Sequence, residues 1–302
     1  MDAAQAEVWN ITNSPDISPL AKAVDKLART LTEAFVRRNV QEQIGRARDA
    51  ATSLNRPLEI CLAFANTDMH AHYSWELLQE SNPPHRMLIT LPGVFITRRF
   101  TFAALPAPIE PGVKKLLIVL GEERGRAECE AVKALWKDEG LEVEVLEFTN
   151  EQRLQLALFS KVWDVVHFIT HGDRERVFLG VPDGRSRGVI LDAHQLGNLM
   201  QGNVRTACLL SVCNSGLRTL EPSDVPGALL WRGVAQHIIG AGVPNVIGWS
   251  NLAYIGDCLR ATPIWHQAYL KGEDPRAATQ KARRVLVGVK ERSYGWLAHF
   301  TA

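Results

Sequence analysis

The chain has 302 residues, enough for one large or two ordinary domains with a sizeable core. Its 34 basic and 33 acidic residues leave a formal charge of +1, which argues against direct nucleic-acid binding and against an anionic membrane surface. Five cysteines, an odd number, do not form a disulfide framework and favour a reducing compartment. No stretch approaches the roughly 20 apolar residues of a membrane span, and the first residues lack signal-peptide character. We therefore expect a cytoplasmic protein without a membrane partner.

The N-terminal region predicts an amphipathic helix. Apolar residues recur at helical spacing at positions 20, 24, 27, 31 and 35, and helical character continues to about residue 54, before Asn55-Arg56-Pro57. Two interpretations remain for this segment. It is either a helix packed at the edge of the domain or the remnant of a regulatory or oligomerising region.

Strand patterns begin at residue 58. We expect strands at 58–64, 86–90 and 95–100, with Pro92-Gly93 turning the last two into a hairpin. A short helical turn with a large aromatic residue is expected at 73–78. A proline-rich linker at 105–112 then separates this region from the next.

From residue 115 onward, strand and helix alternate, which is typical of a mostly parallel α/β sheet with helices on both faces. The expected strands are 115–120, 141–146, 164–170, 204–210 and 243–249, and the expected helices are 124–139, 151–160, 193–200, 227–240, 255–271 and 274–290. A β-excursion is expected between residues 177 and 191, and a polar surface loop at 217–225.

Two of these strands end in chemically suggestive residues. The strand at 164–170 leads into His171-Gly172, and the strand at 204–210 leads into Ser211-Val212-Cys213-Asn214-Ser215-Gly216. Open α/β sheets bind ligands at the carboxyl ends of their strands. If the two strands are neighbours, a base lies beside a nucleophile, which is the arrangement required for covalent catalysis.

The segments VVHFITHG (165–172) and LLSVCNSG (209–216) resemble the His-Gly and Cys motifs of CHAT domains, caspase-like modules of the cysteine-peptidase clan that also holds separases and metacaspases. YSWELL (73–78) and GVPNVIGWS (242–250) are similar to further parts of that family. The resemblance covers about residues 58–302 and implies a caspase-like fold. It divides the chain into an N-terminal helical segment, 1–55, and a peptidase domain, 56–302, with an N-terminal part at 56–110 and a catalytic part at 113–302.

The resemblance also implies roles for single residues. Cys213 would be the nucleophile and His171 the general acid/base. The backbone N–H groups of Gly172 and Cys213 would form the oxyanion hole. Ser211 would lie at the substrate pocket. Asp173 either shapes that pocket or caps the loop that follows His171, and we favour the cap. Because Ser211 is small and neutral, we predict tolerance for a medium-sized apolar or uncharged residue before the cut.

The function implied by the resemblance is that of a cysteine endopeptidase that cleaves a protein substrate. A regulatory or sensor protein partner would control it, as in the proteases of bacterial antiviral defence systems. The alternative is a catalytically silent interaction module with the same fold. We expect no cofactor and no metal, since no cluster of cysteines or carboxylates completes a ligand set around His70 and His72.

Overall fold

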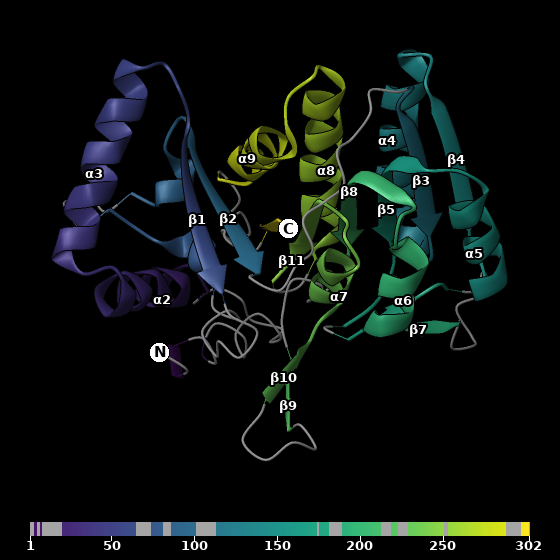
Figure 1. Ribbon diagram of the computed structural model, residues 1–302, viewed down its shortest axis with the longest axis horizontal. Helices are drawn as coiled ribbons and strands as arrows, with labels where there is room; N and C mark the ends of the chain where they lie inside the picture. The colour runs from purple at the N-terminus through teal and green to yellow at the C-terminus, as the bar shows by residue number, and fades with distance from the viewer. Residues whose placement is uncertain are drawn as a thin grey trace.

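Among the residues described in the computed structural model, eight strands form a central sheet in the order β1-β2-β12-β11-β8-β5-β3-β4 (Figure 1). Every neighbouring pair is parallel except β11 and β12. The strands are β1 (Leu58–Phe64), β2 (Val94–Phe100), β3 (Lys115–Leu120), β4 (Glu142–Glu147), β5 (Trp163–Ile169), β8 (Val204–Ser211), β11 (Asn245–Trp249) and β12 (Leu297–Thr301). The prediction of a mostly parallel α/β sheet is confirmed.

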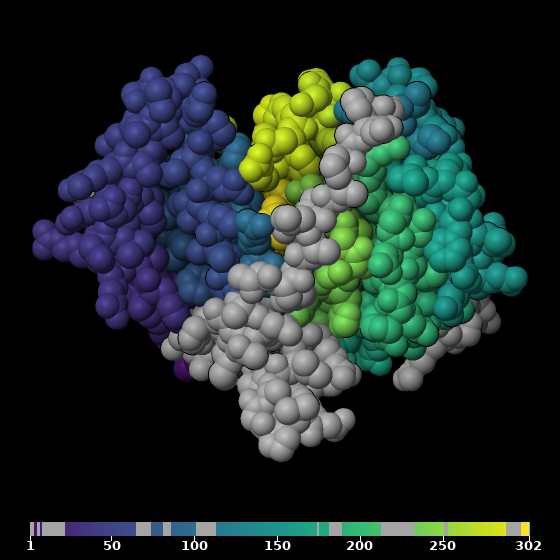
Figure 2. Space-filling view, viewed as in Figure 1, coloured from purple at the N-terminus to yellow at the C-terminus, as the bar shows by residue number. Residues whose placement is uncertain are grey.

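The structure describes residues 3–4, 7, 20–64, 74–80, 86–100, 113–173, 175–180, 189–212, 219–222, 229–250, 253–287 and 297–301. The expected proline-rich linker at 105–112 and the pair His70 and His72 lie outside these ranges, as does Cys213. In the space-filling view, the N-terminal region and the β3–α5 region lie at opposite ends, with the C-terminal elements between them (Figure 2).

The helices cover the sheet in two layers. The crossovers from β3 to β4 and from β4 to β5 run in opposite directions along the sheet, and right-handed crossovers then place their helices on opposite faces. Accordingly, α4 packs against α8 and α8 against α9, whereas α6 packs against α7 and α5. These helices are α4 (Arg126–Asp138), α5 (Glu151–Ser160), α6 (Ala193–Met200), α7 (Val234–Gly240), α8 (Ile255–Leu270) and α9 (Pro275–Leu286).

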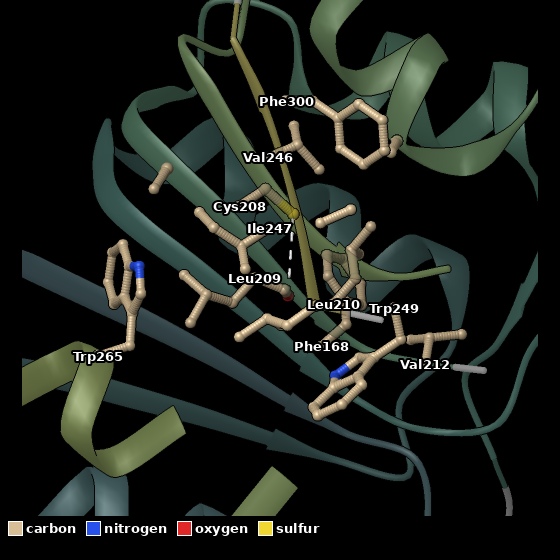
Figure 3. Packing of buried hydrophobic residues seen from close by; sticks show 14 of the residues in the cluster. Phe168, Cys208, Leu209, Leu210, Val212, Val246, Ile247, Trp249, Trp265 and Phe300 are labelled. Atoms are coloured by element: carbon tan, nitrogen blue, oxygen red, sulfur yellow. Dashed lines mark hydrogen bonds between the residues drawn. The ribbon is translucent and has the colours of Figure 1, made fainter. Parts of the chain in front are cut away.

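The centre of the core lies along β5 and β8. Every residue of β5 is buried, as expected for a strand covered on both faces. Cys208 of β8 is fully buried, and Figure 3 shows it among apolar side chains that include Val246 and Ile247 of β11. Burial raises the pKa of the Cys208 thiol. Cys208 is therefore a core residue.

The amphipathic helix predicted from residue 20 is confirmed, but its continuation without a break to about residue 54 is wrong. The chain forms two helices, α2 (Leu20–Phe35) and α3 (Arg38–Ser53), separated by an extended Arg37. Val24, Leu27 and Leu31 of α2 are buried in the core, whereas α3 buries no residue among those described. The break comes where the apolar stripe ends, so packing rather than a glycine or proline decides it. The position of α2 agrees with a helix packed at the domain edge.

The predicted hairpin of 86–90 with 95–100 is also wrong. Residues Leu88–Thr90 form a 3-10 turn, η3, and β2 pairs in parallel with β1. A parallel pair requires a long crossover, and the segment between Phe64 and Val94 provides it. The expected helical turn at 73–78 is confirmed as η2 (Trp75–Leu77), on which α2 packs.

Two predictions near the nucleophile motif need correction. Thr219–Pro222, expected within a surface loop, forms β9, which pairs antiparallel with β10 (Leu229–Arg232). The helix expected from 227 therefore begins only at Val234, after an extended Gly233. The apolar residues at 229–231 suit a strand as well as a helix, and pairing with β9 decides between them. The excursion after His171 is confirmed as β6 (Arg176–Phe178) paired with β7 (Ile190–Asp192).

A buried ion-pair cluster joins the N-terminal and C-terminal parts of the sheet. Glu76 of η2 and Arg98 of β2 are both 0% exposed and form a two-point ion pair. Arg283 of α9 lies 3.7 Å from the Glu76 carboxylate and donates to the carbonyl oxygens of Leu297 and Ile96 at 2.7 and 3.0 Å. Burial lowers the pKa of Arg283 to about 10, although Glu76 opposes this effect. One carboxylate thus compensates two buried guanidinium groups.

Candidate active site

The candidate site lies where the direction of the chain through the sheet reverses. From β3 the chain goes to β4 on one side and then to β5 on the other, so β3 and β5 form a topological switch point. Ligand crevices of open α/β sheets form outside the carboxyl ends of the strands at such a point. Here β3 leads into Gly121-Glu122, β5 into Thr170-His171, and β8 ends at Ser211.

His171 projects from the end of β5 with a side chain that is 56% exposed. Its Nε2 forms an ion-pair contact with Oε2 of Glu122, the second residue after β3. The Nη2 of Arg124 also lies 3.3 Å from the same nitrogen. The imidazole is therefore accessible to a substrate and already oriented by a charged pair from the neighbouring strand end.

Glu122 is held in place by Arg124. Its Oε1 accepts hydrogen bonds from the backbone N–H and the Nε of Arg124, both at 3.1 Å. Partial burial raises the pKa of Glu122. The hydrogen bonds from Arg124 and the electrostatic attraction of the nearby His171 outweigh that effect and bring the pKa below its usual value. The carboxylate is therefore ionised near neutral pH beside the imidazole.

The backbone that carries His171 is fixed by the β6–β7 excursion. Phe178 N–H donates to the carbonyl oxygen of His171 at 2.9 Å, and Gly172 forms an antiparallel bridge with Val177. A Cβ on residue 172 would lie closer than 3.0 Å to Cγ1 of Val212 and to the carbonyl oxygen of Arg176. Glycine is therefore required by close packing between the His171 and Ser211 strand ends, independently of any substrate.

We expect Gly172→Ala to destabilise the protein by about 1–3 kcal/mol, because the added methyl group has no space on either side. Urea unfolding of the variant measures this. Adding Val212→Ala should recover only part of the loss, since the backbone carbonyl of Arg176 cannot withdraw. A single variant as stable as the wild type would show that the packing here is loose.

Asp173 closes the loop that follows the glycine. Its Oδ1 accepts hydrogen bonds from the backbone N–H groups of Glu175 and Arg176, both at 2.9 Å. Its Oδ2 pairs with the guanidinium of Arg176 at 2.6 Å. Partial burial raises the pKa of Asp173, but the hydrogen bonds from Arg176 and Glu175 more than offset this and lower it. These contacts are those of a loop cap.

Ser211, at the end of β8, lies beside a buried carboxylate. Ser211 is 7% exposed, and its hydroxyl donates a hydrogen bond to Oε1 of Glu128 at 2.6 Å. The hydroxyl of Thr262 in α8 donates to the same oxygen at 2.7 Å. Glu128 lies in the first turn of α4, 83 positions from Ser211. The Glu128 carboxylate thus links the end of β8, which leads to the nucleophile motif, to both α4 and α8.

A series of buried ring side chains, linked by hydrogen bonds, continues from the contacts among Ser211, Glu128 and Thr262. Trp136 Nε1–H donates to Nδ1 of His266 at 3.0 Å, and Nε2 of His266 lies 3.2 Å from Nδ1 of His167. Burial, assisted by His167, lowers the pKa of His266 well below its usual value. A neutral His266 that accepts from Trp136 carries its proton on Nε2 and donates to His167. The Nε2 of His167 then faces Ser211 and Glu128 at 3.1 and 3.2 Å. His167 is therefore a buried core residue.

No group of three or more His, Cys, Asp or Glu side chains suited to a metal ion occurs in the described ranges. Within the same ranges, no helix has the length and apolar character needed to cross a membrane.

The fold and the strand-end residues define an α/β module of the caspase-like type. The chain belongs to the CHAT domain family, whose model matches residues 18–302. Two crystal structures of the Saccharomyces cerevisiae separase–securin complex, at 3.0 and 2.6 Å resolution, are similar to it. The first is 15% identical with a TM-score of 0.51 over 80% of this chain, and the second is 14% identical with a TM-score of 0.48 over 76%. The chain spans 15% of the length of the separase chain in each. No curated protein matches.

These comparisons support the caspase-like fold and a family of caspase-like cysteine peptidases. Sequence reasoning missed two acidic residues near the site. Glu122 had a usable signal, because it follows the buried strand at 115–120 in the way that His171 follows its own strand. Glu128 had none, because it lies 83 positions from Ser211 in the sequence and only the tertiary structure brings the two side chains together.

Proposed function

We propose that this chain is a cysteine endopeptidase that cleaves a protein substrate with Cys213 as nucleophile and His171 as general acid/base. The observation that carries the proposal is the register of β5 and β8, in which Ile169 pairs with Ser211. That pair lies on adjacent parallel strands, and in the sequence His171 and Cys213 each come two residues after it. Membership of the CHAT family supports the same assignment.

The proposed reaction follows from the chemistry of the two side chains. The Cys213 thiolate attacks the scissile carbonyl carbon, and the carbonyl π electrons move onto oxygen. The backbone N–H groups of Gly172 and Cys213 would hold that oxyanion. The imidazolium of His171 then protonates the departing amine, and the C–N bond breaks. Water, losing a proton to His171, hydrolyses the thioester and restores the thiol.

The position of His171 favours this function over a silent interaction module. Its ring is more than half exposed at a sheet switch point, and an ionised carboxylate lies against it. A purely structural histidine in this fold is better represented by His167, which is fully buried with all its ring contacts inside the core.

Labelling of new protein N-termini followed by mass spectrometry tests the proposal. The wild-type chain and its Cys213→Ala variant are each added to lysate of the source cells, which also supplies any activating partner. We expect one or a few new termini with the wild type alone. Identical sets of termini in the two samples would refute endopeptidase activity and leave the interaction module.

We further propose that a regulatory or sensor protein partner controls the enzyme in the cytoplasm, in the setting of bacterial antiviral defence. The support is the resemblance to CHAT proteases, together with the protein partner, securin, of the similar separase structures. The segment 217–225, within which Thr219–Pro222 form β9, is the element that we propose to reorder on activation. Ser211 and Asp173 remain the proposed pocket residues, and tolerance for an uncharged residue before the cut remains a prediction.

A further inference from the structure

We propose that Glu122 is a positioning residue for His171. Its carboxylate fixes the imidazole proton on Nε2, so that Nδ1 is the nitrogen that exchanges a proton with Cys213. This inference rests on the proposed function, since it assigns atoms within that reaction. The Oε2 of Glu122 and the Nε2 of His171 form an ion-pair contact across the β3–β5 switch point.

The two carboxylate oxygens of Glu122 contact different partners. Oε1 accepts both hydrogen bonds from Arg124, one from its backbone and one from its side chain. Oε2 is thereby directed to His171. Because the Glu122 side chain is only 18% exposed, water competes little for this contact. The carboxylate is therefore anchored at one oxygen and oriented toward the ring with the other.

Glu122 and Arg124 favour opposite protonation states of the same nitrogen, Nε2 of His171. A guanidinium can only donate, so Arg124 alone would favour an unprotonated Nε2. A carboxylate accepts, so Glu122 favours Nε2–H. The carboxylate is the closer partner, since the Arg124 contact is 3.3 Å long. Nε2 therefore carries the proton, and the lone pair of the neutral ring is on Nδ1.

This tautomer gives a balanced proton path. The Cys213 S–H bond breaks and its proton moves to Nδ1, while the Nε2 proton stays with Glu122 in an ionic hydrogen bond. The imidazolium formed in this way faces a negative charge. When the C–N bond of the substrate breaks, the same Nδ1 proton passes to the amine nitrogen. Glu122 itself neither gains nor loses a proton.

Nitrogen-15 NMR of histidine-labelled protein tests the tautomer without a substrate. Spectra at about pH 9, above the ordinary titration range of histidine, are compared for wild type, Glu122→Ala and Glu122→Gln, with His171→Asn for assignment. The matched control is Glu123→Ala, because the adjacent Glu123 carboxylate binds Arg126 at 2.6 Å. We expect a single Nε2–H form of His171 in wild type and control, and a mixture or the Nδ1–H form in Glu122→Ala. Glu122→Gln retains an acceptor oxygen and should be intermediate.

Kinetics with a substrate found by the N-terminal labelling supply the second readout. We expect Glu122→Ala to lower kcat about 10²-fold with KM unchanged, because a misoriented ring affects the chemical step. Glu122→Asp should recover part of the loss. The proposal is overturned if Glu122→Ala keeps the wild-type tautomer, or if its kcat equals that of Glu123→Ala. If no variant and no wild-type sample cleaves any protein, the proposed function fails, while the NMR comparison still decides the role of Glu122.

Discussion

Cys213→Ala and His171→Ala are each expected to abolish cleavage of the substrate, with a fall in kcat of at least about 10³-fold. Both losses follow from the proposed chemistry, because the first removes the nucleophile and the second removes the proton donor of the leaving amine. The double variant should be no worse than either single variant, since the two groups act as one unit. The measurement is the rate of appearance of the cleaved fragment under single-turnover conditions.

The fold should survive both changes, and matched controls show whether it does. His171 is more than half exposed, so its truncation should change the free energy of unfolding by no more than about 0.5 kcal/mol. The control thiol is that of Cys61, which is exposed on β1 in the other half of the sheet. The control imidazole is that of His194, exposed on α6. Full activity in purified Cys213→Ala protein would disprove the assignment, as would equal losses in Cys61→Ala and His194→Ala.

The largest effect on stability is expected from Glu76→Ala, at about 3–5 kcal/mol. Removing this carboxylate takes away the ion-pair partner that Arg98 and Arg283 share in the core, where their side chains are 0% and 2% exposed. The loss is a large fraction of the 5–15 kcal/mol that holds a typical domain together. Because the cluster joins η2, β2 and α9, the N-terminal part of the sheet should loosen first. Urea unfolding, together with hydrogen exchange of the β1–β2 pair, measures both effects.

Glu80→Ala is the control for this experiment. Glu80 also pairs with two arginines, Arg48 at 2.5 Å and Arg86 at 2.8 Å, but these partners are 35% and 54% exposed. Solvent screens such pairs, so we expect a cost of no more than about 1 kcal/mol. Should Glu76→Ala unfold at the same urea concentration as Glu80→Ala, the buried cluster would contribute no more than a surface pair.

The elements that the sequence predicted well are those whose signal is local. Continuous apolar runs mark β3, β5 and β8 because both of their faces are covered, and a short polar side chain marks a helix start where it accepts a backbone N–H. Asn150 and Asp192 both do so, accepting from Arg153 at 2.9 Å and from Gln195 at 2.7 Å. The sequence signal for the end of a strand is also local. His171 and Ser211 could therefore be assigned to one edge of the sheet before their pairing was known.

Tertiary structure alone decided everything that depends on which segments meet. The direction of β12 relative to β11, the parallel pairing of β2 with β1, and the choice of strand over helix at 229–232 follow from packing partners distant in the sequence. The same holds for the two carboxylates of the site. Glu122 meets His171 because β3 and β5 are neighbours, and Glu128 of α4 meets Ser211 at the end of β8, 83 positions away in the sequence. Periodicity reports the environment of a residue within its own element, whereas a hydrogen bond between distant elements depends on where the sheet places them.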